Sequence, residues 1–419
     1  MSFYSSGDVA TIYIDPKSFI DGNRAVFELE GHHLAYLPNM RLLDNGIFGS
    51  ASDYNELIGC DGIIRDIVLY DGRTELTRMK KFVNFRGFVN HNQSNAKAMS
   101  LRSPKTGCQL GFAVNNVTGL AVYSGRTNPA TAVRTTTGKS FIDLREVLPM
   151  LNSLTHLPSD VFANLRLEIT YNIAPTEQIL DDITDAITGM AIPILAVDVL
   201  DDATIVSKMN RGLSSIQWLE LESDQVFFPQ TATDGGAPDA NVVQELNVRL
   251  DGFKGKSVER MVMIKEFADK NKYLAAGNEP QGFGRFGSVA LYQEKLQIRL
   301  NGSNIFPRGG LEGNMERLAQ VVDTFGECVM IPGFNQLDLD TGACFGVSAA
   351  DGRTYIGDLS YNAWYLGDRV QDLQVVHSRV GLQDSSVFKP STSSLNVIYV
   401  GEVKKALILN KNGYSVVYA

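Results

Sequence analysis

Long apolar runs, runs of basic residues and paired cysteines are all missing from this sequence. No stretch approaches the roughly 18 apolar residues of a membrane-spanning helix. The first 15 residues carry neither the basic nor the apolar region of a secretory signal. The four cysteines, Cys60, Cys108, Cys328 and Cys344, are scattered without CxxC spacing. We therefore expect no signal peptide, no membrane span, and buried free thiols in a reducing compartment.

Positive charge is also scarce. The chain has 38 lysines and arginines against 47 aspartates and glutamates, which gives a formal net charge of −9. Its longest basic runs are the pairs Lys80-Lys81 and Lys404-Lys405, whereas a dedicated nucleic-acid-binding protein usually carries a basic stripe. This balance argues against sequence-specific nucleic acid as a partner.

Histidines are few and have no metal-ligand spacing. The five are His32, His33, His91, His156 and His377, and none lies in an HExxH motif. A cupin-like metal site would need several His and Glu side chains that converge inside one barrel. We expect solvent-facing or hydrogen-bonded structural histidines and predict no metal ligands.

Three short motifs resemble parts of nucleotide or protease sites, but each lacks a required feature. Gly282–Gly287 fits GxGxxG, yet it follows Asn278-Glu279-Pro280 instead of a strand and precedes a predicted strand instead of a helix. Gly138-Lys139-Ser140 resembles the end of a P-loop, but Val133 stands where the first glycine belongs. Asp340-Thr341-Gly342 resembles an aspartic-protease loop without the second one that the mechanism needs. The sequence therefore predicts no catalytic residues and no cofactor.

Two further features are interpreted as structural. Asp71-Gly72-Arg73-Thr74 and Asp351-Gly352-Arg353-Thr354 are identical in sequence and are predicted to form turns. Trp218 and Trp364 are predicted to pack in a core or between domains and not to serve as sugar-binding platforms.

What the sequence does contain is strand alternation closed by tight turns. Leu296, Ile298 and Leu300 alternate with polar residues, which places the apolar side chains on one face of a strand. Asn301-Gly302 follows, a dipeptide suited to positive φ and so to a tight turn. A similar strand and turn, Ile63–Gly72, lies more than half the chain away. This spacing is expected if one β domain occurs twice.

Short strands with turn signals fill both halves. Strands are predicted in the first half at 11–14, 25–29, 37–42, 63–70, 119–123, 165–171 and 192–199. Strands are predicted in the second half at 216–221, 243–250, 261–264, 289–300, 354–357, 370–377, 395–400 and, as a hairpin, 405–418. Helices or helix-and-loop segments are predicted at 73–106, 142–154, 176–188 and 315–325. Long loops are predicted at 124–138, 230–240 and 308–352.

One of these helices has a clear apolar face. Leu144, Val147, Leu148 and Leu151 fall at the i, i+3, i+4, i+7 spacing of a helix, and Pro149 interrupts the pattern.

The strand count indicates an all-β protein. About eight strand candidates in each half, with few helices, favour two tandem eight-stranded antiparallel jelly rolls with a few short helices in loops. A domain of about 200 residues buries roughly 70% of its unfolded surface, so two such domains need no disulfides. We predict an N-terminal arm at 1–8, a first jelly roll at 9–205 and a second at 206–419, joined near 200–212.

Several segments of the chain occur in an order that is typical of a known family. They are Arg24–Leu29 with Tyr36-Leu37-Pro38, Ile64–Gly72, Phe141–Ile169, Gln293–Asn304 and Tyr355–Val375. The pattern resembles the double jelly-roll major capsid proteins of adenovirus-like, tectivirus-like and polinton-like or virophage-type DNA viruses. The chain is shorter than an adenovirus hexon and lacks its very large loops, so the polinton-like or virophage type is the nearest match.

This resemblance implies a structural protein with no active site. Three copies would form a pseudo-hexagonal capsomer of an icosahedral shell in the virion, after synthesis in the reducing cytoplasm or nucleus of a host cell. The implied partners are further copies of the chain, penton and minor capsid proteins, and as a further candidate an internal membrane. Two alternatives are a carbohydrate-binding jelly-roll protein, such as a lectin or fibre domain, and a cupin-like enzyme.

Overall fold

We describe the fold from a computed structural model. It describes residues 9–20, 23–29, 32–45, 47–48, 64–80, 112–114, 121–123, 140–171, 189–213, 215–229, 243–267, 295–312, 361–380, 394–410 and 413–419, with short helical pieces at 316, 319–320 and 323–324. The predicted arm at 1–8, the loops at 124–138 and 230–240, the helix at 176–188, the strand at 354–357 and most of 308–352 lie outside these residues.

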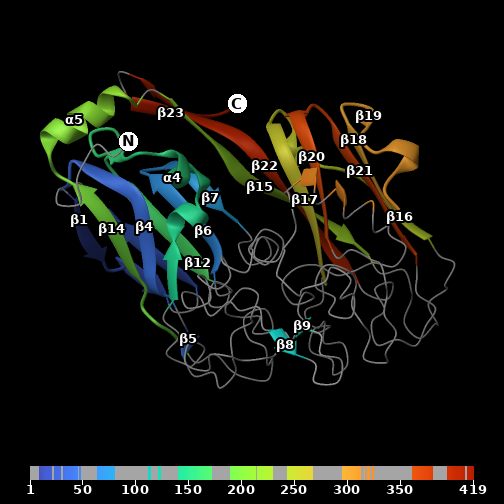
Figure 1. The fold of residues 1–419 in the computed structure, drawn as a ribbon, viewed down its shortest axis with the longest axis horizontal. Coiled ribbons are helices and arrows are strands. Elements are labelled where there is room, and N and C mark those ends of the chain that lie inside the picture. The colour runs from blue at the N-terminus through green and yellow to red at the C-terminus, as the bar shows by residue number, and fades with distance from the viewer. Residues whose placement is uncertain are drawn as a thin grey trace.

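The first half folds into two antiparallel sheets that enclose a core (Figure 1). One sheet has the order β1 (Val9–Ile14), β14 (Ile194–Leu200), β4 (Ala35–Asn45) and β10 (Ser140–Asp143), with β11 (Leu157–Pro158) paired to β4. The other has the order β2 (Ser18–Ile20), β3 (Arg24–Glu28), β12 (Leu165–Tyr171), β6 (Ile64–Asp71) and β7 (Thr74–Met79). Two short strand pairs are β5 (Ile47–Phe48) with β13 (Gly189–Met190), and β8 (Phe112–Val114) with β9 (Ala121–Tyr123).

The second half repeats this arrangement. One sheet has the order β15 (Ser215–Phe228), β22 (Leu395–Asn410), β17 (Ser257–Phe267) and β20 (Tyr361–Arg369), with β23 (Gly413–Tyr418) paired to β22. The other has the order β16 (Val243–Arg249), β21 (Leu373–Val380), β18 (Lys295–Leu300) and β19 (Ser303–Asn304). The helical segments are η2 (Leu144–Glu146), α4 (Pro149–Ser153), α5 (Ala203–Arg211), η4 (Asp251–Phe253) and η7 (Pro307–Gly309).

Alternation in the sequence accounts for the strands that have one apolar face. In β12, every second residue from Leu165 to Tyr171 is buried, as the sequence predicted. Alternation puts successive side chains on opposite faces of a sheet, so one face of β12 lines the core of the first sandwich.

The β15-β22-β17-β20 sheet is different because both of its faces are buried. Met261 and Met263 in β17 belong to the core of the second sandwich. Their neighbours Val262 and Ile264 point to the other face and join the apolar cluster of the first sandwich. A strand buried on both faces reads as a continuous apolar run, which explains why this stretch of the sequence does not alternate.

In the sequence, helix α5 follows β14, the last strand of the first half, and precedes β15, the first strand of the second half. Asp202 caps its first turn by accepting from the backbone N–H groups of Thr204 and Ile205, at 2.8 and 3.0 Å. Val206 and Met209 pack against the end of the first sandwich. Among the described residues, no helix is both long enough and apolar enough to cross a membrane.

One prediction was wrong at the start of the segment 73–106. Thr74–Met79 is a strand, β7, that pairs with β6, and not a helix or loop. Gly72, with φ of 57°, closes the hairpin, and burial of Leu76 and Met79 anchors the strand to the core. Tertiary packing therefore overrides the polar appearance of the segment.

The predicted helix at 142–154 is also corrected. The chain is a strand up to Asp143, a single 3-10 turn, and then α4, which begins at Pro149. Proline fits the first turn of a helix because its missing N–H has no partner there, so Pro149 starts the helix and does not interrupt one. The apolar residues chosen from the spacing are all buried.

Strand boundaries differ most in the last quarter. The strand β20 was not predicted, because its buried Ala363 and Trp364 do not form a simple alternation. Two predicted elements, the strand at 395–400 and the first arm of the closing hairpin, form a single strand of 16 residues, β22. The hairpin itself is confirmed by the pairing of β22 with β23.

Candidate functional site: the junction between the sandwiches

The two sandwiches meet around a buried carboxylate on β15. Glu220 is fully buried, and it accepts hydrogen bonds from the Trp218 indole N–H at 2.7 Å, the Arg78 backbone N–H at 2.9 Å and the Thr77 hydroxyl at 3.3 Å. Trp218 lies two residues from Glu220 on the same face of β15, whereas Thr77 and Arg78 belong to β7 of the first sandwich. One side chain therefore gathers donors from both halves of the chain.

A second carboxylate, two residues further along the same strand face, continues the cluster. Glu222 forms an ion pair with the Arg78 guanidinium and accepts from the Tyr418 hydroxyl at 2.9 Å. The ammonium groups of Lys256 and Lys405 each lie 3.7 Å from it. Both ammonium groups also lie over the Tyr418 ring, at 4.8 and 5.1 Å from its centroid. A cation over an aromatic face is attracted by the ring quadrupole.

The electrostatics of the two carboxylates differ. Burial raises the pKa of Glu220, and the Lys405 charge and the donated hydrogen bonds oppose this only in part. Burial also acts to raise the pKa of Glu222, but the Arg78 charge and the Tyr418 hydrogen bond hold it below its usual value. Burial acts to lower the pKa of Arg78, but the charges of Glu222 and Glu75 raise it above its usual value. Such shifts can mark catalytic groups, but here each carboxylate is engaged by several donors, which suits a structural junction.

The C-terminal strand adds a second set of contacts across the junction. The Tyr414 hydroxyl on β23 donates to Asp71 of β6 at 2.8 Å, and its ring lies 4.9 Å from the Phe162 ring. Because β23 pairs with β22 of the second sandwich, it bridges the two halves (Figure 1).

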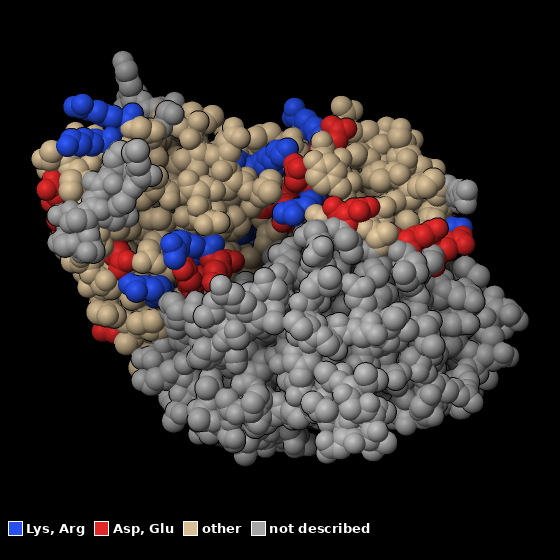
Figure 2. Space-filling model, in the orientation of Figure 1, with Lys and Arg blue, Asp and Glu red and all other residues tan. Residues whose placement is uncertain are grey.

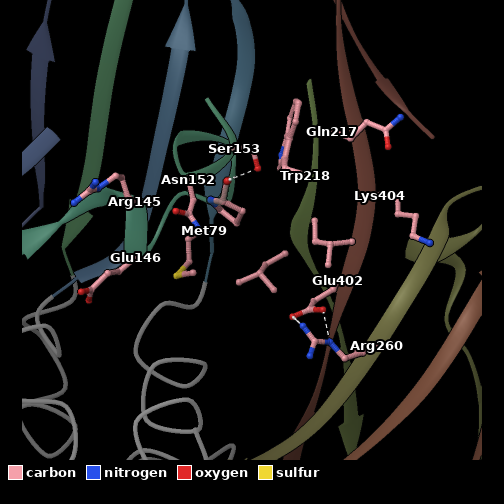
Figure 3. Close-up of a pocket in the computed structure, with 13 residues that line it drawn as sticks. Met79, Arg145, Glu146, Asn152, Ser153, Gln217, Trp218, Arg260, Glu402 and Lys404 are labelled. Atoms are coloured by element: carbon pink, nitrogen blue, oxygen red, sulfur yellow. Dashed lines mark hydrogen bonds and ion pairs between the residues drawn. The ribbon is translucent and has the colours of Figure 1, made fainter. Parts of the chain in front are cut away.

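A cleft of about 660 Å³ lies beside this cluster. Figure 3 shows side chains from α4 and its neighbours on one wall and from β15, β22 and β17 on the other. Arg260 donates two hydrogen bonds to Glu402, at 2.6 and 2.9 Å. Burial raises the pKa of Glu402, and its ion pair with Arg260 opposes the shift. The full lining is Met79, Arg145, Glu146, Pro149, Asn152, Ser153, Gln217, Trp218, Leu219, Leu221, Arg260, Glu402 and Lys404.

Among the described lining residues of the cleft, the Ser153 hydroxyl donates to the Pro149 carbonyl at 3.5 Å. The lining includes a serine, Ser153, but neither histidine nor cysteine. The ionic side chains Arg260 and Glu402 already bind each other. Within the described part of the chain, no group of three or more His, Cys, Asp or Glu side chains could hold a metal ion.

Comparison with solved structures identifies the fold. The chain is similar to PBCV-1 VP54, with 13% identity, a TM-score of 0.58, and coverage of 98% of this chain and 96% of that one. It is similar to a chain of the Sputnik virophage, with 12% identity, a TM-score of 0.55, and coverage of 98% and 88%. It is also similar to the mavirus major capsid protein, with 10% identity, a TM-score of 0.52, and coverage of 99% and 90%. The chain is a double jelly roll.

No protein-family model and no curated protein sequence matches this double jelly roll. The fold prediction made from the sequence is confirmed, including the predominance of antiparallel strands and the short helices in connections. At identities near 10%, these likenesses concern the fold.

Within the double jelly roll, His33, His156 and His377 have structural surroundings. His33 lies 2.8 Å from a carboxylate oxygen of Asp201. His156 is fully buried and hydrogen-bonded through both ring nitrogens, and burial lowers its pKa. His377 stacks on an aromatic ring in the second jelly roll. His91 lies outside the described residues.

Both tryptophans are buried, as predicted. Trp218 lies at the junction and Trp364 in the core of the second jelly roll, with exposed fractions of 5% and 0%. Asp71–Thr74 is the predicted turn between β6 and β7. The GxGxxG, Asp-Thr-Gly and second Asp-Gly-Arg-Thr motifs lie outside the described residues, as do the first two positions of Gly138-Lys139-Ser140.

The sequence analysis did not find the buried carboxylates. In Trp218-Leu219-Glu220-Leu221-Glu222, alternation puts the indole and both carboxylates on one face. That face would ordinarily be assigned to water. The tryptophan among the acids was the available signal, because a large ring on a wet face is unusual.

Proposed function

We propose that this chain is a viral major capsid protein whose homotrimers are pseudo-hexagonal capsomers of an icosahedral shell. The observation that carries the proposal is the double jelly roll itself, which matches capsid proteins over 98–99% of this chain and 88–96% of theirs. The chain would reside in the virion shell after synthesis in the host cytoplasm or nucleus.

We propose the domain division 1–8, 9–205 and 206–419 for this capsid protein. The two pairs of sheets use strands from 9–200 and from 215–418, which supports a joint near α5. In this proposal, residues 1–8 form an arm that ties capsomers together or contacts a minor protein or an internal membrane. Other partners are neighbouring capsomers and the penton and minor capsid proteins, and sequence-specific nucleic acid is not among them.

We propose that the protein is not an enzyme and uses no cofactor or metal. The saturated hydrogen bonding of Glu220 and the closed Arg260–Glu402 pair support this. Replacing Lys139, Asp340 or Gly284 with alanine should leave folding intact and remove no nucleotide or peptide chemistry. Turnover of ATP or peptide that one of these changes abolishes would contradict the proposal.

The carbohydrate-binding alternative is less well supported. Both tryptophan side chains are buried, so neither ring is open to stack on a sugar. In Figure 2, basic and acidic side chains are scattered over a described surface that is mainly neither, and this surface is hollowed between the two jelly rolls.

The decisive experiment is the size and shape of purified full-length protein. Light scattering at micromolar concentration should give three times the 45.9 kDa chain mass, and electron microscopy should show particles with three-fold symmetry and a hexagonal outline. A stable monomer would refute the homotrimer. Deleting residues 1–8 should preserve the trimer and impair shell assembly, and normal shells from the truncated chain would refute the role of the arm alone.

A further inference from the structure

Helix α5 links the two jelly rolls along the chain and lies on the end of the first one (Figure 1). Its side chains Val206 and Met209 pack against Ala35 and Leu200 of the first roll. Among the residues that the structure describes, this cluster holds only these four buried side chains. The position of α5 therefore also depends on the polar contacts at its two ends.

A buried histidine of the first roll binds the end of α5. His156 lies in the short connection between α4 and β11 and is fully buried. Its Nε2 atom lies 2.6 Å from Oδ1 of Asn210, in the last turn of α5, and its Nδ1 atom lies 3.0 Å from the Thr155 hydroxyl. An amide oxygen can only accept, so Nε2 carries the proton and Nδ1 accepts from Thr155. This geometry fits the neutral imidazole.

A second proton on this imidazole would disturb the contact. The imidazolium ion donates through both nitrogens, so Nδ1 would lose the hydrogen bond that it accepts. A full positive charge would also be enclosed away from water, which is unfavourable without close compensation. Burial lowers the pKa of His156, and the Asn210 hydrogen bond and the Asp160 charge oppose this only in part. Proton uptake therefore favours a state in which His156 reaches water.

Other charged and titratable side chains on the surrounding elements offer little compensation. They are Tyr36 on β4, and Asp202, Lys208 and Arg211 on α5. The negative end of a helix dipole attracts a cation, but Lys208 and Arg211 already lie in the last turn of α5. The Asp202 carboxylate caps the opposite end of the helix.

The start of α5 is held in a different manner. His33 lies 2.8 Å from a carboxylate oxygen of Asp201, and the other oxygen accepts from the Leu34 backbone N–H at 2.9 Å. A protonated imidazole is attracted to a carboxylate, so acid would strengthen this contact. The two ends of α5 therefore respond to a proton in opposite directions.

We propose that the hydrogen bond between His156 and Asn210 is an acid-sensitive latch on the helix that joins the two jelly rolls. At neutral pH the latch holds the end of α5 on the first roll. At mildly acidic pH, proton uptake by His156 favours detachment of this end, while Asp201 still holds the start. The latch belongs to the single chain and does not rest on the trimer. In the proposed shell, it would make the link between the rolls respond to acid.

Hydrogen exchange of the full-length protein, read by mass spectrometry on peptides that cover 206–213, tests the latch. Exchange rates at pH 7.0 and 5.5 are compared after correction for the intrinsic effect of pH. The open state should have the ordinary imidazole pKa of 6.5. Its population should therefore rise several-fold, and at most about eightfold, between these pH values. A peptide that covers β12, in the core of the first roll, should show no such rise.

Three variants separate the latch from other effects of acid. His156→Gln keeps a donor toward Asn210 but takes up no proton, so exchange in 206–213 should lose its pH dependence. Asn210→Asp sets a carboxylate against the imidazole, so acid should slow this exchange; it decides the question if glutamine disturbs the packing. The control His33→Gln should keep the acid response of 206–213. No rise in the unmodified protein, or an equal rise in His156→Gln, would overturn the latch.

Discussion

Replacing Arg78 with methionine should weaken the junction between the two jelly rolls. The guanidinium of Arg78 pairs with Glu222, whose side chain is 6% exposed. Methionine keeps most of the apolar stem and removes only the charge and its hydrogen bonds. Glu222 would then keep the Tyr418 hydroxyl and two ammonium groups at 3.7 Å. A buried carboxylate with weaker compensation destabilises the folded protein.

The size of the effect follows from burial. Removing one partner of a buried ion pair typically costs about 3–5 kcal/mol. The Arg78 side chain is 19% exposed, and two lysines compensate part of the loss, so we expect about 2–3 kcal/mol. The matched control is Lys17→Met, which breaks an ion pair with Glu28 whose side chains are 65% and 39% exposed. Such pairs contribute about 0–1 kcal/mol.

The pH dependence has a defined sign. Arg78 holds the pKa of Glu222 below its usual value of 4.5. A carboxylate whose pKa is lower in the folded state stabilises the folded protein at pH values above its unfolded pKa. This contribution is lost as the pH falls through the folded pKa. The difference in the free energy of unfolding between the unmodified protein and Arg78→Met should therefore be largest at pH 7 and should shrink below about pH 4.5.

Urea unfolding monitored by tryptophan fluorescence measures the effect. In a Trp364→Phe background, Trp218 is the single tryptophan, and its indole N–H donates to Glu220 at the junction. The urea concentration at the midpoint of unfolding should fall for Arg78→Met and stay nearly unchanged for Lys17→Met. All variants are compared in the Trp364→Phe background at one protein concentration. Equal midpoints for the two variants at pH 7 would refute the reasoning that burial gives the junction its strength.

Three further predictions concern other contacts. Gly401→Ala should lower the stability measured by thermal unfolding by about 1–3 kcal/mol through overpacking, because the new Cβ would lie 2.6 Å from a Phe253 ring carbon. The control Gly212→Ala, whose Cβ would have an ordinary 3.6 Å contact, should change thermal stability little. Tyr414→Phe should cost about 1 kcal/mol in urea unfolding by removing the hydrogen bond to Asp71. Burial raises the pKa of Tyr414, so its neutral form stabilises the fold below about pH 10 and this contribution is lost at higher pH. Between pH 7 and alkaline pH, the phenylalanine variant should therefore lose less stability than the unmodified protein. Superposing the two halves of an experimental structure should align β6 with β18, and a failure to align them would contradict the tandem repeat.

The sequence analysis predicted elements where the local pattern agreed with the environment. The alternation of Leu165–Tyr171 follows from one buried and one wet face. Alternation also predicted the strand that contains Lys295–Leu300, although Gln297 on its polar side is buried. The closing hairpin was predictable because glycine at position 413 takes a positive φ of 136°. Such signals are local, so one chain segment is enough to read them.

Predictions from the local sequence pattern were wrong where a segment distant in the sequence determines the burial of a residue. Thr74–Met79 looked polar, but the first sandwich buries part of it and the second covers its edge through Glu220. Pro149 looked like an interruption, yet the preceding chain is a strand, so the proline falls at the start of a new helix. Neither outcome can be computed from a window of a few residues.

The sequence by itself determined that this is an all-β chain with two similar halves and few cysteines, because periodicity and composition are properties of the chain alone. Only the tertiary structure decided that Glu220 and Glu222 are buried and paired, because their partners Thr77 and Arg78 lie more than 140 residues away. It also decided which sheet faces are covered within the chain. Burial depends on what packs against a strand, and a strand's own residues do not specify its neighbour.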